Sequence, residues 1–129
     1  MTRYLSLALL PAALAACAPV DEGGRAGGAE LAREIAGRAA GAEQDCVSRQ
    51  QTSGLRIVDA RTLVMSDGAT LWVNRLDGDC PGLRPFAQLI VESHGSQLCR
   101  GDLVRGLEPG STIPGPACPL GRFTPYRRP

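Results

Sequence analysis

The residues with the most definite chemistry in this 129-residue chain are four cysteines: Cys46, Cys80, Cys99 and Cys118. Such thiols form disulfides or bind a metal, and zinc sites usually draw their ligands from closely spaced Cys-x-x-Cys pairs. Here 33, 18 and 18 residues separate successive cysteines, and no Cys-x-x-Cys pair occurs. The spacing therefore predicts two disulfides rather than a zinc site or a redox centre, and the sequence predicts no metal and no cofactor.

The order of the predicted elements favours one of the three possible disulfide pairings. Cys80 and Cys99 flank a predicted hairpin of residues 86–97, while Cys46 and Cys118 fall in the first and last predicted strands. We therefore expect nested bonds that join Cys46 to Cys118 and Cys80 to Cys99. Closing loops of these lengths stabilises a fold by about 3–4 kcal/mol per bond, which is a large contribution for so small a core.

The fifth cysteine, Cys17, follows an apolar run at residues 5–14. This run is too short to cross a bilayer core, which takes about 20 residues, so it is predicted to be the core of a secretory signal. Residues 14–17, Leu-Ala-Ala-Cys, resemble the lipobox of bacterial lipoproteins, which implies a signal peptide over residues 1–16 and a lipid anchor on Cys17. Ala18 in the next position implies the outer membrane, facing the periplasm. The alternative is an ordinary signal peptide cut beside Cys17, which leaves a free thiol.

Three short patterns that suggest activity have simpler structural interpretations. His94 follows Glu92 and Ser93, but neighbouring strand residues point to opposite faces, so the three do not form a catalytic triad. Residues 77–79, Asp-Gly-Asp, resemble the start of a calcium loop without its later ligands, and they are read as a solvated turn. Residues 100–102, Arg-Gly-Asp, are read as a structural part of a strand. The chain is therefore predicted not to be an enzyme.

The charge composition excludes further classes of function. The chain has 14 arginines and no lysine, against 13 acidic residues, for a net charge of +1. Without lysine there is no Schiff-base or P-loop lysine chemistry. Because the charges nearly cancel, we expect no binding to nucleic acid through neutralisation of phosphates.

The rest of the chain divides by composition into a tether, a helix and a β domain. Residues 17–28 are rich in glycine and predict a flexible tether. Residues 29–42 have helical spacing and predict a short helix that packs lightly or frays. Residues 43–129 predict an all-β domain of six or seven short strands, either a small antiparallel barrel, which we favour, or a curled sandwich. The clearest predicted strands are residues 55–59, 62–65, 69–76, 86–92, 97–104 and 118–124.

The candidate contact surface combines aromatic rings with guanidinium groups. Trp72, Tyr126, Arg127 and Arg128 are residue types enriched at protein interfaces. The alternative is that Phe123 and Tyr126 fill the end of a barrel while the arginines are solvated. Trp72 is then buried in a strand that is covered on both faces.

The four cysteines and their neighbours resemble a family of small, uncharacterised proteobacterial envelope proteins that carry a domain of unknown function. The resemblance implies the disulfide framework and the envelope location, but no substrate, cofactor or catalytic residue. We expect a non-catalytic cell-envelope lipoprotein that binds another envelope protein or a cell-wall polymer. The alternative is a module that binds a small ligand or inhibits an enzyme, through the barrel mouth or the loop of residues 81–86. The matching segments are residues 73–76, 80–86, 98–102, 118 and 120–128.

Overall fold

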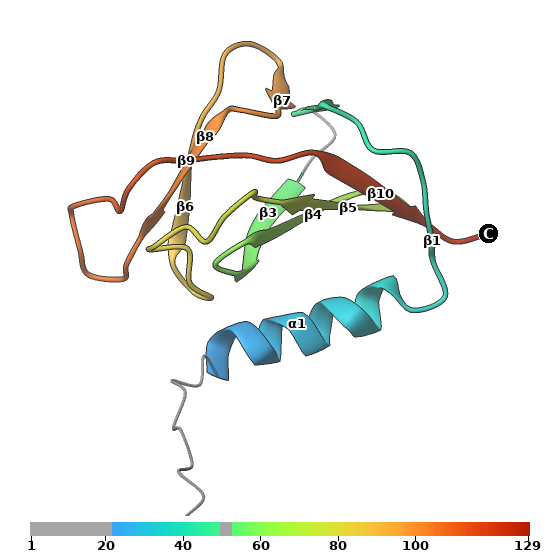
Figure 1. Cartoon of the computed structure of the whole chain (residues 1–129), viewed down its shortest axis with the longest axis horizontal. Coiled ribbons are helices and arrows are strands. Elements are labelled where there is room, and N and C mark those ends of the chain that lie inside the picture. Colours follow the sequence, from blue (N-terminus) through green and yellow to red (C-terminus); the bar gives the residue numbers. More distant parts are fainter. Residues whose placement is uncertain (1–21, 50–52) are drawn as a thin grey trace, which may run out of the picture.

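The structure is a computed structural model that describes residues 22–49 and 53–129, and within those ranges it has one helix and ten short strands. Antiparallel sheets pack around a common core as a sandwich, and the helix lies along the outer face of the larger sheet (Figure 1). The predicted all-β fold is thus confirmed in its sandwich form. In chain order the elements are α1 (Glu22–Ile35), β1 (Ala39–Ala40), β2 (Cys46–Ser48), β3 (Ser53–Asp59), β4 (Thr62–Asp67), β5 (Thr70–Arg75), β6 (Gln88–Glu92), β7 (Gln97–Cys99), β8 (Leu103–Leu107), β9 (Cys118–Pro119) and β10 (Phe123–Arg127).

The larger sheet has five strands in the order β1-β10-β5-β4-β3. Its central hairpin follows from local sequence: β4 and β5 pair from Thr62 opposite Arg75 to Asp67 opposite Thr70, and Gly68 supplies the positive φ of 54° in the turn. The predicted Asp-Gly hairpin is confirmed. β10 then adds to β5, and β1 adds to β10.

Both faces of this sheet are buried, and the alternation of side chains along β5 sorts them between two cores. Leu71 and Val73 pack toward α1, while Trp72 lies in the larger core inside the sandwich. In β4, Val64 likewise packs on the helix side of the sheet and Met65 packs on the sandwich side. A strand covered on both faces reads as a continuous apolar run, and each of these strands has one at its centre, residues 63–65 in β4 and residues 71–73 in β5.

No closed barrel forms in the described part of the chain. The large sheet ends at β1 on one side and at β3 on the other, and these two strands do not pair. The barrel is therefore wrong and the curled sandwich is correct. The physical reason is that this sheet is apolar on both faces, and a helix over one face with a second sheet over the other covers both.

The helix begins and ends earlier than predicted. It spans Glu22–Ile35 rather than residues 29–42, and residues 39–40 form β1 instead. The predicted tether of residues 17–28 is therefore wrong from residue 22 onward, and its first five residues lie outside the described ranges. Leu31 is buried against the sheet, so the helix is held by packing despite its glycines.

Gly27 explains why glycine is tolerated inside this helix. A β-carbon on Gly27 would lie 2.1 Å from the carbonyl oxygen of Val58 in β3, so only a hydrogen fits between the two backbones. A β-carbon on Gly28 would meet nothing within 4 Å. The glycine-rich segment therefore allows a close contact between helix and sheet.

The second layer consists of two small sheets, β6-β8-β9 and β2-β7. The predicted strand of residues 97–104 is divided, because Gly101 has a φ of 90° and turns the chain between β7 and β8. The Asp102 carboxylate accepts a hydrogen bond from the Cys99 amide (2.7 Å) and closes this turn. Gly101 and Asp102 thus shape a turn, and the Arg-Gly-Asp sequence lies in this turn and not in the predicted strand.

The favoured disulfide pairing is wrong. The bonds join Cys46 to Cys99 and Cys80 to Cys118. The prediction took Cys80 and Cys99 to flank one hairpin, whereas β6 pairs with β8, and the strand that carries Cys99 pairs with β2 directly opposite Cys46. Cys80 is left to meet Cys118 in β9. The bonds span 53 and 38 residues, and each is expected to stabilise the fold by about 4 kcal/mol.

Candidate functional site

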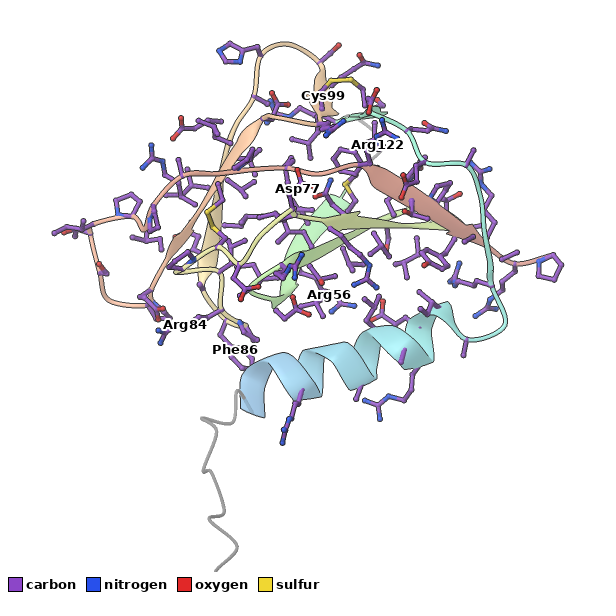
Figure 2. The ribbon with its side chains drawn as sticks, in the orientation of Figure 1. Arg56, Asp77, Arg84, Phe86, Cys99 and Arg122 are labelled. Carbon is purple, nitrogen blue, oxygen red and sulfur yellow. A yellow bond between two sulfur atoms is a disulfide. The ribbon has the colours of Figure 1, made fainter. Side chains whose placement is uncertain are left out.

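A short loop in the connection from β5 to β6 carries the most exposed large apolar side chain of the described residues. We call residues 80–87 the Phe86 loop. Its sequence, Cys-Pro-Gly-Leu-Arg-Pro-Phe-Ala, contains two prolines that preset backbone angles, which favours turns over a strand. Figure 2 shows Arg84 and Phe86 at the end of the sandwich near the first turns of α1.

The Phe86 loop is fixed at its start and its middle. The Cys80 amide donates a hydrogen bond to the Ala60 carbonyl (2.8 Å), and Cys80 is bonded to Cys118. Leu83 is buried in the sandwich core with Cys80. Two turns shape the loop, with the Leu83 amide bonded to the Cys80 carbonyl and the Ala87 amide bonded to the Arg84 carbonyl. The tip is therefore presented by a constrained frame rather than by a free loop.

Neighbouring loops support the same frame. Gly106 in β8 passes so close to Gly82 that a β-carbon on Gly106 would lie 1.8 Å from the Gly82 carbonyl oxygen. The Gly115 amide donates a hydrogen bond to the Gly106 carbonyl (2.8 Å), which places a third segment against the other two. On the surface, Arg84 pairs with Glu108 at 3.5 Å. The Phe86 loop thus packs on two other segments, around residues 106 and 115.

Phe86 itself is 95% exposed and has a φ of 74°. It is the single non-glycine residue with positive φ in the described ranges. This conformation costs a bulky residue about 1–3 kcal/mol, and such residues persist where the surrounding structure imposes them, often at binding sites. An exposed ring gains almost no stabilisation from burial. Neither packing nor the conformational preference of phenylalanine therefore accounts for the exposure and positive φ of Phe86.

Two cavities adjoin the ring of Phe86. One, of about 490 Å³, is lined by Ala60 and residues 80–86. The other, of about 330 Å³, lies between α1, β3 and the end of the loop, with the partly buried Arg56 in its wall. Arg56 is held by an ion pair with Glu34 of α1. The aromatic ring therefore stands between two hollows with mostly apolar walls, an arrangement suited to contact with another protein.

The predicted contact surface does not exist as one surface. Trp72 is 7% exposed and lies in the sandwich core, so it is wrong as a contact residue, and the alternative of a strand buried on both faces is correct. Tyr126 is partly buried against the helix-side core. Arg127 and Arg128 are exposed, and Arg127 donates a hydrogen bond to the Thr70 hydroxyl (3.1 Å). Trp72 and Tyr126 therefore lie on opposite faces of the large sheet.

The residues considered for catalysis or metal binding are separated in the structure. Glu92 pairs with Arg105 (2.7 Å) at the end of β6, while His94 is exposed in the following loop. Asp79 pairs with Arg61 at 3.5 Å. Within residues 22–49 and 53–129, no three His, Cys, Asp or Glu side chains lie close enough together to hold a metal ion.

Cys17, the predicted lipidation site, lies outside the described residues. Of the helices that the structure describes, none is long and apolar enough to cross a membrane. No family model, curated protein or solved structure matches this chain. The functional argument therefore rests on the site itself.

From the sequence, residues 81–86 are only an alternative binding site, and Phe86 is predicted to begin a strand. The structure begins that strand at Gln88 and leaves Phe86 in the loop. The sequence signal for this loop is the two prolines and one glycine that follow Cys80, since these residue types mark loops. Exposure of the ring is a tertiary property, and the sequence has no pattern that reports it.

Proposed function

We propose that this protein is a non-catalytic interaction module of the bacterial cell envelope and that it binds a partner protein through the Phe86 loop. The observation that carries the proposal is the 95% exposed ring of Phe86, held at positive φ on a disulfide-linked loop. Such a residue contributes to binding at reduced entropic cost because the backbone that carries it is already constrained. The partner has an apolar pocket that accepts an aromatic side chain.

The proposed location rests on three features. The lipobox-like sequence at residues 14–17 supports a lipid anchor on Cys17, in the outer membrane and facing the periplasm. Two disulfides support an oxidising compartment, where such bonds persist. A Cys17→Ser variant is expected to leave the membrane fraction. Its retention in urea-washed membranes would contradict the anchor but not the role of the Phe86 loop.

The interaction is tested by site-specific crosslinking in whole cells. The photoreactive residue p-benzoylphenylalanine replaces Phe86 in one strain and Ile113, the second exposed large apolar residue at 79%, in a matched control strain. We expect a discrete adduct from position 86 that is absent from position 113. No adduct from position 86, or the same adducts from both positions, would overturn the proposal.

A second candidate function is inhibition of an enzyme by the same loop. This function is favoured because the Phe86 loop is held by the Cys80–Cys118 disulfide and by the buried Leu83. A segment that inhibits an enzyme by entering its active site must be rigid in this way. Here the crosslinked partner is a hydrolase or other enzyme whose activity falls on addition of the protein. A Phe86→Asn variant that inhibits that enzyme as strongly as the wild type would exclude Phe86 as the inhibitory residue.

A further inference from the structure

A third cavity, separate from the two beside the Phe86 loop, is lined by charged side chains. It has a volume of about 260 Å³, and we call it the arginine cleft. In Figure 2, Asp77 and Arg122 lie well away from Phe86. The residues that line the arginine cleft are Glu43, Arg75, Asp77, Arg100, Arg122 and Thr124.

The arginines of the cleft differ in how well they are neutralised. Arg122 pairs with Asp45 at 3.4 Å and with Glu43 at 3.8 Å. Within residues 22–49 and 53–129, the guanidinium groups of Arg75 and Arg100 make no hydrogen bond and no ion pair with a side chain or the backbone. Two cations thus face the cleft without a protein partner.

One anionic group of the cleft also lacks a partner within the described residues. The Asp77 carboxylate makes no hydrogen bond or ion pair within the described ranges, although the Asp77 carbonyl accepts a bond from Arg61 (3.2 Å). The unneutralised groups are therefore two guanidiniums and one carboxylate. A polyanion fits this set poorly, because Asp77 would repel it.

The backbone holds these charges at fixed positions. The buried Asn74 side chain bonds both the amide (3.0 Å) and the carbonyl (2.8 Å) of Gly121, which joins the end of β5 to the segment before β10. The Arg100 amide donates a hydrogen bond to the Asp45 carbonyl (2.6 Å), which ties the turn after β7 to the residue just before β2. Arg75 ends β5 and Arg122 immediately precedes β10, so both lie next to the register pair of Asn74 with Phe123.

The charge of Arg122 is balanced by Asp45 and Glu43, whereas the exposed guanidinium groups of Arg75 and Arg100 have no partner within residues 22–49 and 53–129. Guanidinium groups bind carboxylates through charge-assisted, often bidentate, hydrogen bonds. A carboxylate binds an ammonium group by the same attraction.

We propose that the arginine cleft binds an acidic amino acid with a free ammonium group. Its two carboxylates bind Arg75 and Arg100, and its ammonium group binds Asp77. The volume of the cleft is below that of a typical drug-sized site, which suits a ligand of this size. This site is independent of the proposed binding through the Phe86 loop, since no residue of that loop lines it.

The test is an NMR titration of the folded protein with glutamate, glutarate and inorganic phosphate as separate probes. Glutamate is expected to bind and to shift the signals of residues that line the cleft. Glutarate, which lacks the ammonium group, is expected to bind at least tenfold more weakly. Absence of glutamate binding, or equal binding of glutarate or phosphate, would overturn the proposal.

Exposed residues allow variants that do not disturb the fold. Arg75→Gln and Arg100→Gln are each expected to weaken glutamate binding about tenfold or more, while Arg33→Gln on the exposed face of α1 serves as the matched control. Asp77→Asn is expected to weaken binding of glutamate but not of glutarate. An equal loss in the Arg33 variant would contradict the site. Phe86→Asn is expected to leave this binding unchanged, which separates it from the proposed partner interaction.

Discussion

Adjacent glycines in α1 allow a matched pair of substitutions with opposite expected effects. Replacing glycine by alanine inside a helix stabilises the helix by about 1 kcal/mol. At Gly28 the new methyl group meets nothing within 4 Å, so Gly28→Ala is expected to gain this amount. At Gly27 the same methyl group would lie 2.1 Å from the Val58 carbonyl oxygen and 3.0 Å from its carbon, so backbone atoms must separate.

The magnitude follows from what this separation disturbs. α1 must move away from β3 by more than 1 Å to restore an ordinary contact, and Leu31 leaves its buried position with it. Overpacking of this kind costs about 1–3 kcal/mol, which offsets or exceeds the gain in helix propensity. The two variants are therefore expected to differ by about 1–3 kcal/mol, and each kcal/mol corresponds to about 4–8 °C in Tm for a domain of this size.

Two spectroscopic probes follow the change on the two sides of the sheet. Circular dichroism in the helical region reports α1, while fluorescence of the single tryptophan, Trp72, reports the sandwich core. For Gly27→Ala, the helical signal is expected to be lost at a lower temperature than the fluorescence change. For Gly28→Ala, both transitions are expected to coincide at a higher temperature than in the wild type. Equal stabilisation of both variants would refute the packing of α1 on β3.

Three further changes test other parts of the structure. Phe86→Asn is expected to raise the free energy of unfolding by about 1 kcal/mol in a urea titration, because asparagine tolerates positive φ; a loss of stability would contradict the strain argument. Asn74→Leu is expected to cost about 3 kcal/mol in the same titration, because it leaves both backbone groups of Gly121 buried and unbonded; a neutral effect would mean that water replaces Asn74. Cys80→Ser is expected to lower the free energy of unfolding by about 4 kcal/mol, with a lower Tm. An unchanged Tm would contradict this stabilisation. A wild-type peptide in which Cys80 is bonded to a cysteine other than Cys118 would refute the pairing.

Local sequence patterns predicted the parts of the fold that local interactions determine. The Asp-Gly turn at residues 67–68 and the alternation along β5 both identify a hairpin whose two faces carry different side chains. The disulfide pairing could not be read in this way. It depends on β7 leaving the β6-β8 sheet to pair with β2, and this choice is made by contacts between residues far apart in the chain.

The helix shows where composition is misleading. Glycines at residues 23–28 favour a flexible segment by propensity, and the prediction followed propensity. In the structure this segment belongs to α1, and Gly27 is the residue at which the helix touches β3. Tertiary packing thus overrides local preference, and the small size of glycine is the property that packing uses.

The sequence predicts that the candidate site is a loop, but it does not predict which side chains of that loop are exposed. The sequence marks residues 81–86 as a cysteine-flanked loop, but it cannot report that Leu83 points inward while Phe86 remains in solvent. The charges of the arginine cleft come from four separate segments of the chain. Only the fold brings them to one cavity, so no spacing rule in the sequence could have indicated that site.

The position of β10 has a consequence for how the molecule assembles. β10 lies inside the large sheet, between β1 and β5, and it places Phe123 in the sandwich core. Ala39 is paired with Arg127, so the two strands that meet there are synthesised at opposite ends of the described chain. Until residue 127 has been added, β5 has an open edge, β1 has no partner, and the core lacks a fully buried aromatic ring. Folding is therefore expected to finish slowly, and only after residue 127 has been synthesised, and deleting β10 would remove an interior strand of the large sheet.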